Sequence, residues 1–171
     1  MKYKSAGLLL GLSLMLPWLV HAAADVTITV NGSVVARPCQ TPPGDTTVDF
    51  GDVYTTSLNT ARSTTAWQDI TLILSGCPVG TSTVKATFTG PAASNANYYA
   101  NSSITGSAGG IELELQDSAN GLLNNGASRD IPVDFTTGTA ELPVKVRVRS
   151  ESGQPTEGNI EAVINVTYTY Q

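Results

Sequence analysis

Few residues of this chain belong to the types that catalyse reactions. Its only histidine is His21, which lies in an N-terminal stretch with the features of an export signal. A serine or cysteine nucleophile needs a base such as histidine. Once the signal is removed, the chain therefore contains no Ser-His or Cys-His pair. No group of histidines, cysteines and acidic residues has the spacing of a metal site, so we expect neither a metal ion nor another cofactor.

One pair of carboxylates could support acid–base chemistry. Glu112 and Glu114 lie two positions apart in the alternating segment 111–116, and paired carboxylates are what glycosidases use. Alternating polar residues are, however, typical of the solvated face of an antiparallel strand. We therefore interpret both glutamates as residues of a solvated strand face, and we expect no catalytic residue and no enzymatic activity.

The first 23 residues are predicted to be a signal peptide. Lys2 and Lys4 provide the positive start, residues 6–20 are almost entirely apolar, and three alanines follow His21. As a helix, the apolar stretch would be about 22 Å long, shorter than the ~30 Å hydrocarbon core of a bilayer. We expect cleavage between Ala22 and Ala24, and therefore an exported protein.

Charge and cysteine content constrain the exported chain further. Nine Lys and Arg and 14 Asp and Glu become a net charge of 7 − 14 = −7 once Lys2 and Lys4 are removed. This charge argues against a nucleic-acid partner, which requires a basic surface. Cys39 and Cys77 are the only cysteines. In an oxidising compartment such an isolated pair predicts a disulfide.

Period-2 alternation of apolar and polar residues dominates the remaining sequence and predicts strands. No apolar pattern of helical period occurs, and Gly, Pro and Asn turns separate the segments. Seven or eight short strands of this kind indicate an all-β sandwich of the immunoglobulin type. The predicted strands cover residues 46–53, 68–75, 83–89, 98–99, 111–116, 131–135, 140–150 and 160–170, in addition to an N-terminal segment from residue 26 to residue 34.

The N-terminal segment permits two interpretations. Its apolar face consists of Val26, Ile28, Val30, Gly32 and Val34, and prolines at 38 and 42–43 separate it from the rest of the chain. The pattern is equally consistent with the first strand of the chain's own sandwich and with a strand that leaves its own domain. The last segment, residues 160–170, alternates in the same way up to the C-terminus.

Several stretches resemble the type 1 fimbrial pilins of the chaperone–usher pathway, and the resemblance covers essentially the whole exported chain. Gly158 is fourteenth from the C-terminus and Tyr170 is penultimate, a spacing typical of that family. The stretches that carry the resemblance are residues 24–32 (ADVTITVNG), 34–36, 38–39, 66–69 (AWQD), 77–82 (CPVGTS) and 160–170.

The resemblance implies an incomplete immunoglobulin-like sandwich, a pilin domain over residues 38–171 that lacks its final strand. Residues 24–37 would be an N-terminal donor-strand extension whose apolar face fills a neighbour's groove. The chain's own groove, which a periplasmic chaperone fills first, would lie beside the C-terminal strand. The residues implied for this acceptor groove and chaperone edge are Gly158, Ile160, Ala162, Ile164, Val166, Tyr168 and Tyr170.

By the same resemblance, the chain would be a minor adaptor subunit of a bacterial surface fimbria. It would link a tip adhesin to the rest of the fibre and so support cell adhesion, with neighbouring subunits, a periplasmic chaperone and an outer-membrane usher as partners. The alternative is a small secreted carbohydrate-binding adhesin domain. The exported chain of 171 − 23 = 148 residues has no room for a lectin domain ahead of a pilin domain, which favours the adaptor.

Overall fold

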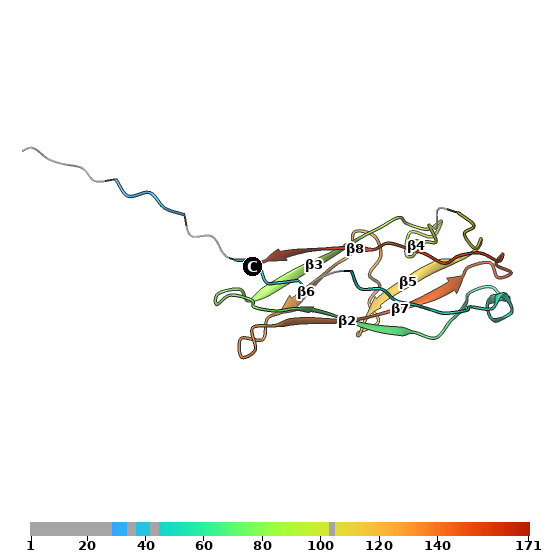
Figure 1. The fold of residues 1–171 in the computed structure, drawn as a ribbon, viewed down its shortest axis with the longest axis horizontal. Coiled ribbons are helices and arrows are strands. Elements are labelled where there is room, and N and C mark those ends of the chain that lie inside the picture. Colours follow the sequence, from blue (N-terminus) through green and yellow to red (C-terminus); the bar gives the residue numbers. More distant parts are fainter. Residues whose placement is uncertain (1–28, 34–36, 42–44, 103–104) are drawn as a thin grey trace, which may run out of the picture. The chain divides into compact units, whose positions relative to one another are not determined.

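The computed structural model describes residues 29–33, 37–41, 45–102 and 105–171. The chain separates into two units, residues 1–34 and residues 35–171, and every strand of the described residues belongs to the second (Figure 1). The expected signal peptide, residues 1–23, lies outside the described residues. No helix among the described residues is long and apolar enough to cross a membrane.

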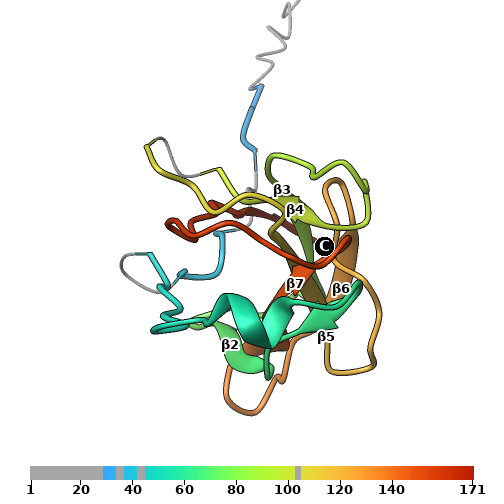
Figure 2. The same cartoon turned by 90° about the vertical axis from the view of Figure 1, so that its right-hand side faces the viewer.

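The second unit consists of two antiparallel sheets that pack face to face, as the view along the sandwich shows (Figure 2). One sheet has the order β1-β7-β5-β4, with β2 also paired to β7, and the other has the order β6-β3-β8. A 3₁₀ turn, η1 (Thr55–Leu58), precedes the strands. These are β1 (Ser63–Thr64), β2 (Gln68–Leu74), β3 (Thr83–Thr89), β4 (Tyr99–Ala100), β5 (Glu112–Asp117), β6 (Ser128–Pro132), β7 (Ala140–Ser150) and β8 (Asn165–Tyr170).

Strict alternation in the long strands builds the core. Leu142, Val144 and Val146 of β7 point inward and form one buried cluster with the inward residues of β3, which are Val84, Ala86 and Phe88. Val148 of β7 is buried in a second, smaller cluster. Tyr99 of β4 belongs to the larger of the two clusters, and its hydroxyl donates a hydrogen bond to the carbonyl oxygen of Leu123 over 2.7 Å. Burial raises the pKa of this phenol to about 12, so it stays a neutral donor inside the core.

The predicted all-β sandwich is confirmed, and β2, β3, β5 and β7 lie where the alternation predicts them. Three predicted strands are wrong in extent, and one of them, predicted over residues 131–135, forms instead as β6 over residues 128–132. No strand forms over residues 46–53, and the last strand begins at Asn165 rather than at residue 160. Just before β8, the amide of Glu161 donates to the Asn101 side chain and its carbonyl accepts from Ser102. A side-chain partner interrupts the ladder there, although the alternation of burial continues.

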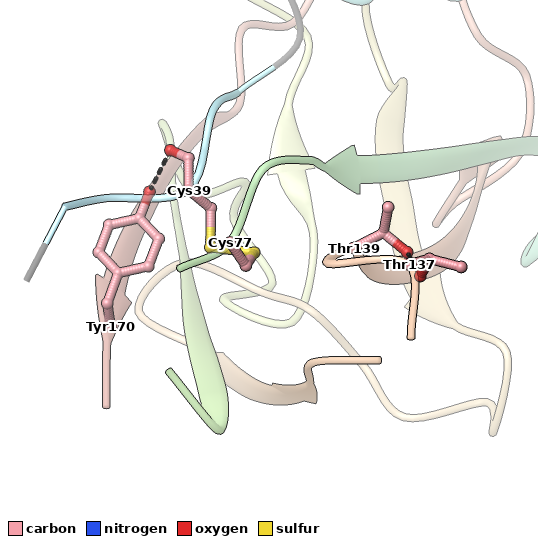
Figure 3. Close-up of a disulfide and its surroundings, with 5 residues drawn as sticks. All are labelled: Cys39, Cys77, Thr137, Thr139 and Tyr170. Carbon is pink, nitrogen blue, oxygen red and sulfur yellow. Dashed lines mark hydrogen bonds between the residues drawn. A yellow bond between two sulfur atoms is a disulfide. The ribbon is translucent and has the colours of Figure 1, made fainter. Parts of the chain in front are cut away.

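The predicted disulfide between Cys39 and Cys77 is present and fastens residues 37–41 to the end of β2 (Figure 3). Next to it, Gln40 and Ser75 exchange two backbone hydrogen bonds of 2.7 and 2.9 Å. Cys39 is buried in the main core cluster. The chain therefore enters the sandwich at a fixed position.

Replacing both cysteines, Cys39→Ser with Cys77→Ser, should lower the free energy of unfolding by about 4 kcal/mol. A cross-link over 38 positions removes roughly that much chain entropy from the unfolded state. Urea unfolding measures the loss, and a thiol assay on the unfolded, unreduced parent protein should find no free thiol. Two reactive thiols in the parent would contradict the bridge.

Candidate functional site

Strand β8 occupies the end of its sheet and offers one free edge. It pairs with β3 from Val84 opposite Tyr170 to Thr89 opposite Asn165, and no strand among the described residues pairs with its other side. A strand edge of this kind presents unpaired amide and carbonyl groups in a row. It can therefore accept a further strand.

The apolar face of the C-terminal segment is only half covered. Every second residue of it packs against the core yet remains half-buried, whereas the inward residues of β3, such as Val84 and Phe88, are fully buried. The same alternation thus gives complete burial in the middle of the sandwich and incomplete burial along this side. The half-buried residues of the segment are Ile160, Ala162, Ile164, Val166, Tyr168 and Tyr170.

A second half-buried row packs against the same core cluster. Val48 and Phe50, in the segment before η1, and Ile70 and Leu72 of β2 pack against the core without being covered. The segment before η1 and residues 160–170 both run along the length of the sandwich (Figure 1). We call the uncovered strip between these two rows the open side of the core.

The C-terminal segment and the segment from residue 39 to residue 53 contact each other at both ends of the open side. At one end, the Tyr170 hydroxyl donates to the Cys39 carbonyl oxygen over 3.4 Å (Figure 3). At the other end, Val53 and Ile160 line one cavity of about 210 Å³. Because residue 39 lies beside 170 and residue 53 beside 160, the flanking segments run in opposite directions. The open side is therefore closed at both ends by contacts between these two antiparallel segments.

Gly158 is required where the C-terminal row begins. Its φ of 151° lies outside the range of L residues, and a Cβ there would come within 2.4 Å of the Ala108 amide nitrogen. Only glycine allows residues 106–108 to approach so closely. Gly158 thus positions the start of the row and borders the cavity, which is a structural reason for the glycine that the sequence singles out.

The described part of the N-terminal segment contributes no strand. Val30 is 87% exposed, and nothing lies within 4 Å of a Cβ built on Gly32. Residues 29–33 have no strand assigned. The other predicted donor residues, Val26, Ile28 and Val34, lie outside the described residues.

Glu112 and Glu114 are not on a solvated face, contrary to the expectation from the sequence. They point away from the sandwich core but are only 5% and 4% exposed, because arginines of β7 cover them. Arg147 donates from Nε to Glu114 over 2.7 Å, and Gln116 donates to its other oxygen. The register that places Glu114 opposite Arg147 explains this burial, which the sequence of one strand does not reveal.

The glutamates form two ion pairs of different quality. Arg149 Nε lies 3.5 Å from Glu112 Oε1, which accepts no hydrogen bond, and Arg149 also pairs with Glu151. Burial, followed by the nearby Glu151 charge, raises the pKa of Glu112. Each carboxylate faces an arginine, and neither borders the 210 Å³ cavity. The pair is therefore a structural ladder on the outer face of the sheet.

Glu114→Gln should destabilise the fold and Glu112→Gln should not. The first change breaks a charge-assisted bond with Arg147, worth about 1.5–3 kcal/mol, whereas the second removes a poorly paired charge. Because the folded pKa of Glu112 is raised, its carboxylate reduces stability above that pKa, and the cost is relieved as pH falls through it. Urea unfolding of both variants is followed by Trp67 fluorescence. Glu112→Gln should have a higher free energy of unfolding than the parent at pH 7, and this difference should disappear at lower pH. Equal losses for the two variants would contradict the assignment.

No group of three or more potential metal ligands occurs among the described residues. The outer face of the sheet that contains β7 also has cation–π contacts. Lys145 and Arg147 lie over the Trp67 ring, and Arg149 lies over the Tyr98 ring. The open side of the core is thus the site with the clearest capacity to bind a partner.

Comparison with known proteins identifies the family. The family model described as "Fimbrial protein" matches residues 28–171. The chain belongs to the fimbrial protein family. It is 46% identical over 170 residues to Protein FimG of Escherichia coli strain K12, covering 99% of each chain.

Two further comparisons agree. The chain is 43% identical over 150 residues to the S-fimbrial adhesin protein SfaS of Escherichia coli strain 536, covering 86% of each chain. Its fold matches a subunit in a solved chaperone–usher pilus with a TM-score of 0.64 and 24% identity, over 91% of this chain and 99% of the other. The predicted resemblance to chaperone–usher pilins is confirmed, and the all-β sandwich is the fold of a pilus subunit.

Proposed function

We propose that this chain is a minor structural subunit of a bacterial surface fimbria, an adaptor that links a tip adhesin to the rest of the fibre. It would be assembled by donor-strand exchange, with no catalytic role. The observation that carries the proposal is the open side of the core. A sandwich that leaves a row of half-buried apolar residues beside a free strand edge is complementary to one added strand.

The added strand would come first from a periplasmic chaperone and then from the next subunit at the outer-membrane usher. In this proposal, Gly158, Ile160, Ala162, Ile164, Val166, Tyr168 and Tyr170 line the acceptor groove. One further alternating strand would bury their exposed halves and pair with the free edge of β8. The burial and the backbone pairing both require an extended peptide with apolar residues at every second position.

The N-terminal extension, residues 24–37, supplies a strand of that kind for another subunit. Its apolar residues alternate from Val26 to Val34, and among the described residues both sheets are built from positions 63–170. Burying four branched side chains would contribute about 1.5–3 kcal/mol each. A chain with both a donor and a groove has two neighbours in a fibre, and this supports an internal position rather than the terminal one.

One observation favours the alternative, a small carbohydrate-binding adhesin. A 43% identical relative is named as an adhesin. Glycan-array binding by this protein, with its extension bound in another subunit, would favour that function. Absence of glycan binding in a fibre that still requires the chain would favour the adaptor.

A matched pair of neighbouring residues tests the groove. Ile164 is half-buried on the open side, whereas Val163 is 58% exposed on the opposite face of the segment. Ile164→Asp should abolish co-purification of the periplasmic chaperone and incorporation into fibres, because a carboxylate would have to be buried under the added strand. Val163→Asp should leave both at the parent level.

The contradicting outcomes are distinct. If both variants lose chaperone binding and incorporation equally, the substitutions act on the fold. If both variants retain them equally, the groove has no role in assembly. Measuring the protease resistance of residues 45–171 in each variant separates these cases.

A further inference from the structure

Two large apolar side chains are exposed at the end of the sandwich where the chain enters it. Val79 is completely exposed and Phe135 is 72% exposed. Both are on turns next to the disulfide, and the Cys77 amide donates to the Gly138 carbonyl oxygen over 2.9 Å, which ties the two turns together. Figure 3 shows the second turn, through Thr137 and Thr139, beside Cys77.

Both turns hold their apolar residue in a defined position. Val79 is at the tip of a turn closed by the Thr81 amide on the Pro78 carbonyl, with Gly80 at a φ of 103°. Phe135 follows Asp134, whose carboxylate accepts a hydrogen bond from the Thr136 amide over 2.8 Å. Polar residues follow or flank both side chains along the chain, Thr81 and Ser82 after the first turn and Asp134 and Thr136 on either side of Phe135. An ordered apolar centre with a polar rim is typical of a contact surface rather than of a loop exposed by chance.

The position of this surface limits which molecule can cover it. Cys39 is fixed at the same end by the disulfide and by the bonds of Gln40 to Ser75. If Val34 is the last residue that the extension inserts into a neighbour, the five residue steps from Val34 to Cys39 span at most about 18 Å. The groove of the receiving subunit must then lie within that distance of Cys39, which brings the body of that subunit close to this end of the sandwich.

We propose that Val79 and Phe135 form a contact patch for the body of the fimbrial subunit that receives this chain's N-terminal extension. The inference rests on the proposed donor-strand function and adds a second contact to that joint. Two side chains are far too few for an independent interface, which requires about 1,000 Å². A tether of this length, however, raises the local concentration to the millimolar range, where a small apolar contact suffices. The patch would then restrict bending of the joint rather than provide its strength.

Site-specific photo-cross-linking in assembled fibres tests this. The photoreactive amino acid p-benzoylphenylalanine replaces Val30, Val79, Phe135 or Val163, one at a time, in the full chain expressed with its fibre partners. Val30 reports the subunit that receives the extension. We expect positions 79 and 135 to cross-link to that same subunit and position 163, equally apolar and exposed elsewhere, to give no such product.

The outcomes separate the two proposals. A Val30 cross-link to a subunit that positions 79 and 135 do not reach would overturn the patch and leave the donor strand intact. No subunit cross-linked to Val30 would overturn the donor function itself. As a second measurement, Val79→Ser with Phe135→Ser should keep the Val30 cross-link but widen the distribution of bend angles at this joint in electron micrographs. An unchanged distribution would contradict the role of the patch.

Discussion

A second copy of residues 24–37 fused after Gln171 should convert this chain into a soluble monomer that needs no chaperone. The fused strand would cover the open side of the core and pair with β8. Four branched side chains would then contribute about 6–12 kcal/mol in total, which is comparable to the whole stability of a typical domain. Thermal melting and size-exclusion chromatography of the parent and the fusion protein measure the effect.

The linker length of the fusion protein also reveals the direction of the added strand. A strand antiparallel to β8 can follow Gln171 after a four-residue turn. A parallel strand must first return along the whole row from residue 170 to residue 160, a distance of about 33 Å, and so needs a linker of well over ten residues. Stabilisation with both linkers indicates the antiparallel direction, and stabilisation with the long linker alone indicates the parallel one.

A matched fusion protein provides the control. Its donor copy keeps its length and linker but carries serine in place of Val26, Ile28, Val30 and Val34. This copy can still form backbone hydrogen bonds but buries no apolar surface, so most of the gain in melting temperature should disappear. Equal stabilisation by both fusions would mean that the open side of the core does not select apolar side chains.

Deleting residues 24–37 should leave the domain folded and remove one of its two connections in the fibre. In the donor-strand proposal these residues belong to a neighbour's core, so the truncated protein should still bind its chaperone through the C-terminal segment. It should fail to join the subunit that would receive the extension. Co-purification with the chaperone and recovery in purified fibres are the two measurements.

The competing interpretation predicts the opposite. If residues 26–34 form the first strand of their own sandwich, deletion removes four branched side chains from that core. The loss would amount to several kcal/mol against a typical total of about 5–15, and the domain would aggregate. A truncated protein that cannot fold even with the chaperone present would refute the donor-strand account. Pro38→Ala with residues 24–37 retained is a mild control, because it changes the junction without removing the strand.

The sequence alone determined which residues share a face and, for the long alternating segments, where the strands lie. Alternation over 83–89 and 140–150 placed β3 and β7 at their observed bounds, because the side-chain period of a strand is set by its backbone. The pairing of Cys39 with Cys77 followed from there being no other cysteine in an exported chain. These features depend on local geometry and on counting, and neither requires knowledge of the neighbouring strands.

Tertiary structure decided which faces are covered and by what. Ile164 and Val146 have the same alternating context in the sequence, yet Val146 is buried and Ile164 is half-buried, because β7 lies inside its sheet and residue 164 lies on the open side. Likewise Glu114 is buried because β5 and β7 pair in a register that places Arg147 opposite it. Alternation gives each side chain a direction, but burial depends on how many strands surround it. That number is a property of the assembled sheets.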